Sequence, residues 1–65
     1  MWTVVYIAKS MQIAEQIRGI LEADGMLVKI RPIAKGAENA AGSCEVLVPE
    51  SEVEQAHGLI IEADF

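Results

Sequence analysis

The sequence predicts one α+β domain over residues 1–65, with elements in the order strand, helix, strand, strand, helix. Three observations lead to this order. Residues 2–8 are rich in β-branched and aromatic side chains, which favour a half-buried strand. Residues 11–24 carry apolar side chains at helical spacing. Residues 44–54 contain a short apolar run that leads through a proline into a helix start.

The first helix has a signal at each end. Ser10 precedes the helical pattern and can cap its N-terminus, while Gly25 follows Asp24 and can adopt the left-handed conformation of a C-terminal cap. The apolar positions of this helix repeat at i, i+1, i+4, i+7 and i+8, so they predict one buried stripe: Ile13, Ala14, Ile17, Ile20 and Leu21.

Residues 26–33 are predicted to form the second strand, because Val28 and Ile30 alternate with charged side chains. Pro32 cannot donate to a ladder, so this strand should lie at an edge of the sheet. The small and polar residues 34–43 indicate a mobile loop, and residues 44–48 are predicted to form the third strand.

The second helix is predicted to start after Pro49. Ser51 and Glu54 have the spacing of a capping box. Glu50, Glu52 and Glu54 suit the positive end of the helix dipole, and this explains the acidic run better than a metal site does.

These elements favour one arrangement. Two strands joined by a helix should run parallel with a right-handed crossover, and the third strand should be antiparallel between them. The sheet order is then 1-3-2 with both helices on one face, which is a ferredoxin-like βαββα fragment that lacks the final strand.

Strict alternation sorts the strand side chains into two faces. The side chains expected under the helices are Thr3, Val5, Ile7, Val28, Ile30, Cys44, Val46 and Val48. The opposite face, which also carries Glu45, should be polar if it were only solvated, yet it carries several apolar residues. We therefore predict an interaction surface made of Trp2, Val4, Tyr6, Leu27, Lys29, Arg31 and Leu47.

Composition limits the partners. Ten acidic and five basic residues give a net charge of −5, which disfavours nucleic acid even though Trp2 and Tyr6 with Lys29 and Arg31 resemble a stacking platform. The sequence shows no secretory signal pattern and no apolar run of the ~20 residues that a membrane helix needs. We therefore expect a cytoplasmic protein without a membrane partner.

Catalytic chemistry has few candidates. Cys44 is the single cysteine, and in the predicted register it is a small buried hydrophobe. His57 is the single histidine and is expected at the boundary of the second helix's apolar stripe. One Cys and one His without partners form no catalytic constellation, so we expect no enzyme activity, no cofactor and no metal.

Three segments carry a resemblance: MWTVVYIA at the start, LEADGMLVKIRP at the close of the first helix, and CEVLVPESEVEQAH. They cover much of the chain, which resembles a family of short bacterial proteins, the prokaryotic signal-transducing proteins of unknown function. The resemblance implies a ferredoxin-like fragment and a dimer, and it implies no catalytic residues. Some short members are labelled glutamate decarboxylase, but a pyridoxal-phosphate decarboxylase needs a far larger scaffold than 65 residues.

The sequence thus predicts a small regulatory or protein-interaction module that forms a homodimer and contacts an unidentified protein partner. A chain of this size has a small core and therefore a low free energy of unfolding, and oligomerisation commonly adds the missing buried surface. Pairing can occur face to face through Trp2, Val4, Tyr6 and Leu47, or edge to edge through the first strand. The alternative is a small-metabolite-sensing domain that binds its ligand on the sheet face or in a dimer crevice.

Overall fold

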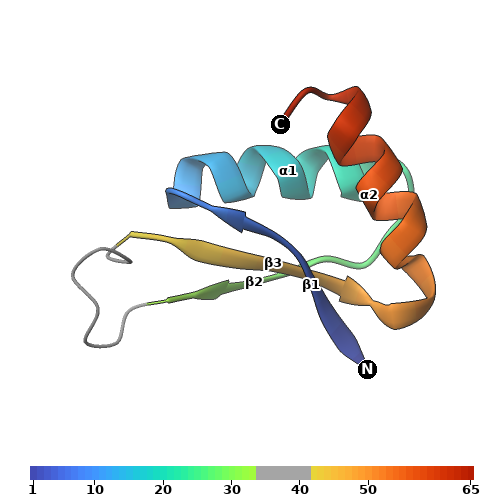
Figure 1. The fold of residues 1–65 in the computed structure, drawn as a ribbon, viewed down its shortest axis with the longest axis horizontal. Coiled ribbons are helices and arrows are strands. Elements are labelled where there is room, and N and C mark those ends of the chain that lie inside the picture. Colours follow the sequence, from blue (N-terminus) through green and yellow to red (C-terminus); the bar gives the residue numbers. More distant parts are fainter. Residues whose placement is uncertain (34–41) are drawn as a thin grey trace.

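The computed structural model describes residues 1–33 and 42–65 (Figure 1). The elements follow the predicted order, with one short 3-10 turn ahead of the last helix. They are β1 (Trp2–Ala8), α1 (Met11–Ala23), β2 (Lys29–Pro32), β3 (Cys44–Pro49), η2 (Glu50–Glu52) and α2 (Val53–Glu62). Most of the predicted loop over 34–43, namely residues 34–41, lies outside the described residues.

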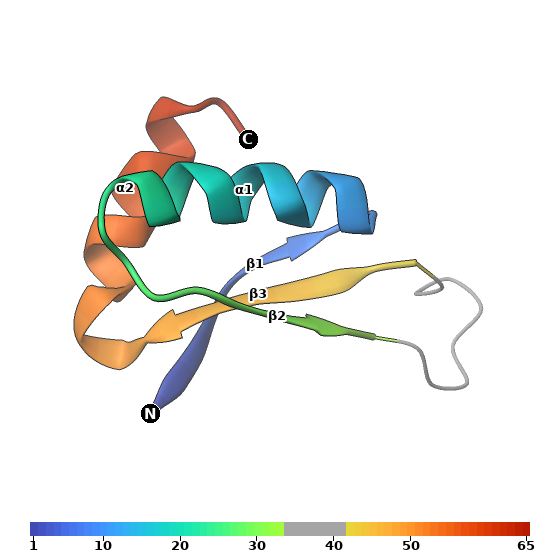
Figure 2. The same cartoon turned by 180° about the vertical axis from the view of Figure 1, so that it is seen from behind.

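The three strands form one sheet in the order β1-β3-β2, and β3 is antiparallel to both neighbours. β1 and β2 therefore run parallel to each other, as two strands joined through a helix should. Both helices lie over the same face of this sheet (Figures 1 and 2). The predicted α+β class, strand order and placement of the helices are confirmed.

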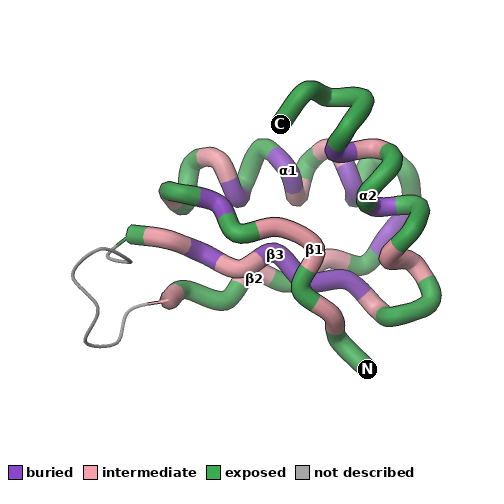
Figure 3. Tube along the Cα trace, in the orientation of Figure 1, coloured by how far each residue is buried: buried purple, intermediate pink, exposed green. Residues whose placement is uncertain are grey.

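The core lies between the helices and the sheet, and buried positions are concentrated on β3 and on the helices (Figure 3). α1 contacts all three strands, whereas α2 contacts β1 and β3. The largest fully buried side chains come from α1 and β3: Ile17, Leu21, Val46 and Val48. The central strand therefore supplies two of the four largest fully buried side chains, and it is the strand that has a neighbour along both edges.

The start of α1 forms as the sequence predicts. Ser10 has an extended backbone, and its hydroxyl oxygen accepts a hydrogen bond from the Ile13 N–H at 3.2 Å. This bond satisfies one of the four N–H groups that a helix start leaves without an intrahelical partner.

The end of α1 explains why β2 is shorter than predicted. Gly25 has φ +89°, its N–H donates to the Glu22 carbonyl, and the Met26 N–H donates to the Leu21 carbonyl at 3.2 Å. This pair of bonds is a Schellman motif, and it turns the buried Met26 side chain into the core. Met26 thus belongs to the helix end, and the strand predicted over residues 26–33 is limited to Lys29–Pro32.

The start of the second helix differs from the prediction. Residues 50–52 form the 3-10 turn η2, and α2 begins at Val53 without a hydrogen bond from a capping side chain. Ser51 lies inside η2, two residues after the cap position of η2 and one residue before that of α2, so it caps neither helix and the predicted capping box with Glu54 is wrong. β3 ends at Pro49, and the 3-10 turn η2 brings the chain back over the sheet. Because this turn occupies residues 50–52, the α-helix starts only at Val53.

The end of α2 repeats the geometry of the end of α1 with a different residue at the left-handed position. Asp64 has φ +67°, its N–H donates to the Ile61 carbonyl, and the Phe65 N–H donates to the Ile60 carbonyl at 3.3 Å. The motif turns Phe65 back toward the sheet, where its ring meets the ring of Tyr6. α2 is also joined to the end of α1 by a hydrogen bond from the Gln55 amide to the Asp24 carboxylate.

Candidate interaction surface

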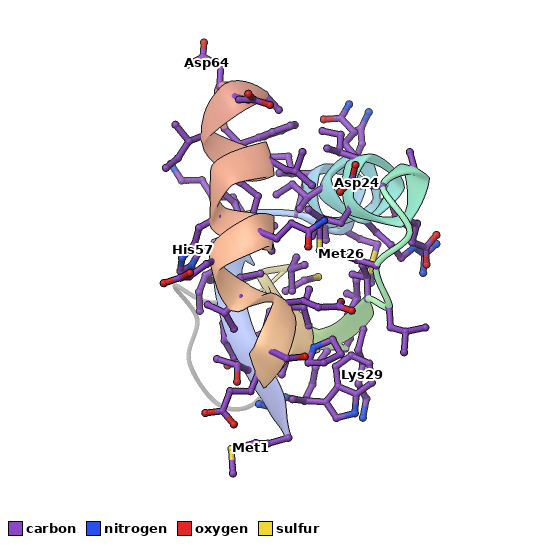
Figure 4. All side chains as sticks on the ribbon, turned by 90° about the vertical axis from the view of Figure 1, so that its right-hand side faces the viewer. Met1, Asp24, Met26, Lys29, His57 and Asp64 are labelled. Atoms are coloured by element: carbon purple, nitrogen blue, oxygen red, sulfur yellow. The ribbon has the colours of Figure 1, made fainter. Side chains whose placement is uncertain are left out.

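The sheet has one face under the helices and one face without a covering layer in the part of the chain that the structure describes. We call the second face the outer face. Its side chains lie in three cross-strand rows, because residues in register point to the same side of a sheet. The rows are Trp2 with Pro49, Val4 with Leu47 and Lys29, and Ile7 with Glu45 and Arg31. Figure 4 shows Lys29 on the far side of the sheet from both helices.

A β-bulge in β1 changes the predicted faces. The register with β3 shifts between Val4 and Tyr6, so Val5 is an extra residue without a partner of its own. After the bulge the alternation is reversed, and Tyr6 pairs with Val46 on the helix side. Tyr6 packs against the core, so its predicted place on the outer face is wrong.

Ile7 takes the outer position that was predicted for Tyr6. It lies opposite Glu45, and 53% of its surface is exposed. Sequence reasoning missed it because residues 4–7 are apolar at both odd and even positions, so the pattern contains no sign of where an extra residue enters the strand. The bulge also places Trp2 and Tyr6 on opposite faces, so the two aromatic rings do not form a common stacking platform.

Leu47 lies on the outer face but is not exposed. Only 4% of its surface is accessible, although it does not belong to the core cluster under the helices. The Lys29 ammonium nitrogen lies 5.4 Å from the centroid of the Trp2 ring, so these side chains from the two outer strands meet across β3. Lys29 lies opposite Leu47 in the ladder and Trp2 lies diagonally across from it, so the indole and the lysine stem are placed to shield Leu47 from water. The cation over the ring adds about 0.5–1 kcal/mol at such an exposed site. The prediction that Leu47 is part of an exposed patch is therefore wrong.

The remaining members of the predicted surface lie toward β2. Leu27 is exposed, but it precedes β2 and has no partner in the described ladder. Arg31 is paired with Glu45, with 2.7 Å between Nε and Oε1 and 2.6 Å between the terminal guanidinium nitrogen and the same oxygen. An exposed pair of this kind contributes about 0–1 kcal/mol.

The exposed apolar part of the outer face is thus formed by β1. Trp2 is 42% exposed and Val4 is 37% exposed, and Ile7 extends the same side of the strand. The charged side chains of the outer face lie on the other two strands, where two bases and one acid, Lys29, Arg31 and Glu45, sum to +1. The helical segments 11–24 and 50–65 carry one base and eight acids, which sum to −7. The acidic character of the chain is therefore concentrated on the helical side.

The candidates for chemistry lie apart from this surface. Cys44 is buried, as predicted, and its Sγ lies 3.7 Å from the Gly42 carbonyl oxygen. His57 is exposed on α2 (Figure 4). Neither of the described helices has the length and apolar composition required to cross a membrane.

A scan against protein-family models found no matching family, and searches of curated proteins and of solved structures found no similar protein. The resemblance to the prokaryotic signal-transducing proteins therefore stays a prediction from the sequence.

Proposed function

We propose that this chain is a small protein-interaction module that acts by self-association through the outer face. The observation that carries the proposal is the exposed apolar side of β1, formed by Trp2, Val4 and Ile7. A sheet face that only meets water is expected to be polar, and a contiguous apolar stretch on a small protein usually marks a contact.

Two further features favour contact between copies. A chain of this size buries only about 60% of its unfolded surface, so association adds burial that the single domain lacks. The helical side of each copy carries most of the negative charge, and two such sides would repel each other. The outer face has a net charge of only +1, so two copies meet there at a low electrostatic cost.

Sedimentation equilibrium over a wide concentration range tests the proposal. The wild-type chain should form a dimer, and the double variant Trp2→Ala plus Ile7→Ala should dissociate at concentrations at least about tenfold higher, since large side chains at the centre of an interface carry most of its binding free energy. Ile61→Ala is the matched control, because Ile61 is an exposed isoleucine on α2.

Circular dichroism would verify that each variant is folded before its mass is compared. A wild-type chain that stays monomeric up to millimolar concentration contradicts the proposal. An Ile61→Ala variant that weakens the dimer as much as the double variant would move the contact to the helical side.

A further inference from the structure

We infer that a second copy of this chain pairs antiparallel with β1 along Trp2–Val4, so that two sheets join into one continuous sheet with the two β1 strands at its centre. This inference rests on the proposed function, because it takes self-association as given and places the contact at the edge of the sheet beside Trp2 and Val4, two residues of the outer face. It rests on the main-chain hydrogen bonding of the two outer strands and on the distribution of charge.

The ladder between β1 and β3 leaves main-chain groups of β1 unused. In an antiparallel pair, residue pairs that exchange both hydrogen bonds alternate with pairs that exchange none. The Glu50 N–H donates to the Met1 carbonyl at 2.8 Å, which makes Met1 a bonded position. Trp2 lies opposite Pro49, which has no N–H to donate, and is the next, non-bonded position.

The same alternation makes Thr3 a bonded position and Val4 a non-bonded one. The N–H and C=O groups of Trp2 and Val4 therefore point away from β3, toward the free edge of the sheet. No strand of the described residues pairs with these groups, and such a row is a template for another strand.

The opposite edge of the sheet is a poor template. The Ile33 N–H donates to the Ser43 carbonyl at 2.9 Å, so the bonded positions of β2 are those in step with Ile33, and Ile30 and Pro32 face the free edge. Pro32 has no N–H, and β2 has only four residues against seven in β1. Lys29 and Arg31 add charge along this short strand, which also discourages strand addition.

The free edge of β1 is complementary to itself. With a two-fold axis beside Thr3, Trp2 of one copy lies opposite Val4 of the other, and each such pair exchanges both main-chain hydrogen bonds. The axis is perpendicular to the sheet, so the two outer faces become one surface and the Trp2 and Val4 side chains of different copies become neighbours. The bulge at Val5 ends the regular strand and fixes where the pairing stops.

Charge favours a second copy at this edge. β1 is the one described element without a charged side chain, whereas each of the others carries at least one. Two chains that each carry −5 can therefore approach along β1 without placing like charges opposite each other.

A proline substitution tests the edge directly. Val4→Pro removes an N–H that the ladder with β3 does not use, so the single domain should keep its fold, whereas the dimer loses a hydrogen bond in each of its two Trp2–Val4 pairs. We expect the dissociation constant to rise about 30-fold or more. Val4→Ala is the matched control, since it shortens the side chain and keeps the N–H, and its dissociation constant should rise less than about fivefold.

The outcomes separate this inference from the proposed function. A monomeric wild-type chain overturns both. A dimeric wild type with equal dissociation constants for Val4→Pro and Val4→Ala overturns only the pairing along β1, and contact through the side chains of the outer face would stand.

If Val4→Pro does not fold, amide hydrogen exchange on the wild-type chain tests the pairing along β1. The Trp2 and Val4 amides should be protected at concentrations where the dimer forms and should lose protection on dilution, while the Val48 amide, which is bonded to Thr3 within one chain, stays protected throughout. Rapid exchange of the Trp2 and Val4 amides in the dimer would overturn the inference.

Discussion

The rings of Tyr6 and Phe65 meet edge to face, with their centroids 6.5 Å apart and their planes at 77°. This contact joins β1 to Phe65, three residues after the end of α2, and it exists because the bulge at Val5 turns Tyr6 toward the helices. Edge-to-face pairs contribute about 0.5–1.5 kcal/mol beyond the burial of their area. The contact therefore links the register of β1 to the position of α2.

A double-mutant cycle with Tyr6→Leu and Phe65→Leu should give a coupling free energy of about 0.5–1.5 kcal/mol in urea unfolding, because each single change removes the ring pair and keeps an apolar side chain. Pairing Tyr6→Leu with Ile61→Leu serves as the control and should give additive effects. A coupling near zero for Tyr6 and Phe65 would mean that the two rings do not interact in solution.

The bulge predicts opposite responses to charge at adjacent positions. Tyr6→Lys should lower the free energy of unfolding by more than about 2 kcal/mol, since it places an ammonium group against the core. Ile7→Lys should change it by less than about 0.5 kcal/mol, because Ile7 is exposed and its neighbour across the ladder is Glu45. A regular strand without the bulge would reverse the two results.

The two serines before the helices should respond differently to the same substitution. Ser10→Ala should cost about 1 kcal/mol, because the Ser10 hydroxyl caps α1. Ser51→Ala should cost less than about 0.5 kcal/mol, since Ser51 is exposed within η2 and makes no capping bond. Equal losses, measured by urea unfolding, would restore the capping box at the start of α2.

Asp64 is the one non-glycine residue with a positive φ in the described chain. Asp64→Gly should raise the free energy of unfolding by about 0.5–1 kcal/mol, because glycine adopts this conformation without a steric cost. Asp64→Asn separates the two causes, since it removes a negative charge from the C-terminal end of the helix and keeps a side chain. Ala63→Gly, at a right-handed position, should not stabilise the chain, and thermal unfolding would compare the three variants.

Two leucines near the outer face should differ in their contribution to stability. Leu47→Ala should cost about 2 kcal/mol or more, because it opens a cavity under the Trp2 and Lys29 side chains. Leu27→Ala should cost less than about 0.5 kcal/mol, since Leu27 is exposed outside the ladder. A small loss at Leu47 in urea unfolding would indicate that the indole and lysine do not cover it in solution.

The features that local chemistry determines were predictable from the sequence. The bounds of β1, the cap at Ser10 and the glycine at the end of α1 each depend on residues that lie close together in the chain, so their signals could be read directly. The strand order agreed with general rules, because two strands joined by a helix run parallel and consecutive strands tend to be neighbours, which suits an antiparallel strand placed between them. Trp2, Val4, Lys29 and Arg31 were placed correctly on the outer face, since they lie before the bulge or on strands without one.

The tertiary structure alone decided the features that depend on contacts between distant residues. Val5 is an extra residue only when β1 is compared with β3. The side chains of residues 4–7 are apolar and suit either face of the sheet, and the packing of Tyr6 against Phe65 places Tyr6 on the helix side. Leu47 lies between two other strands whose Trp2 and Lys29 side chains approach each other across β3, and it is 4% exposed. Sequence periodicity describes one strand at a time, whereas register and cover are relations between strands, and the packing of the whole domain sets them.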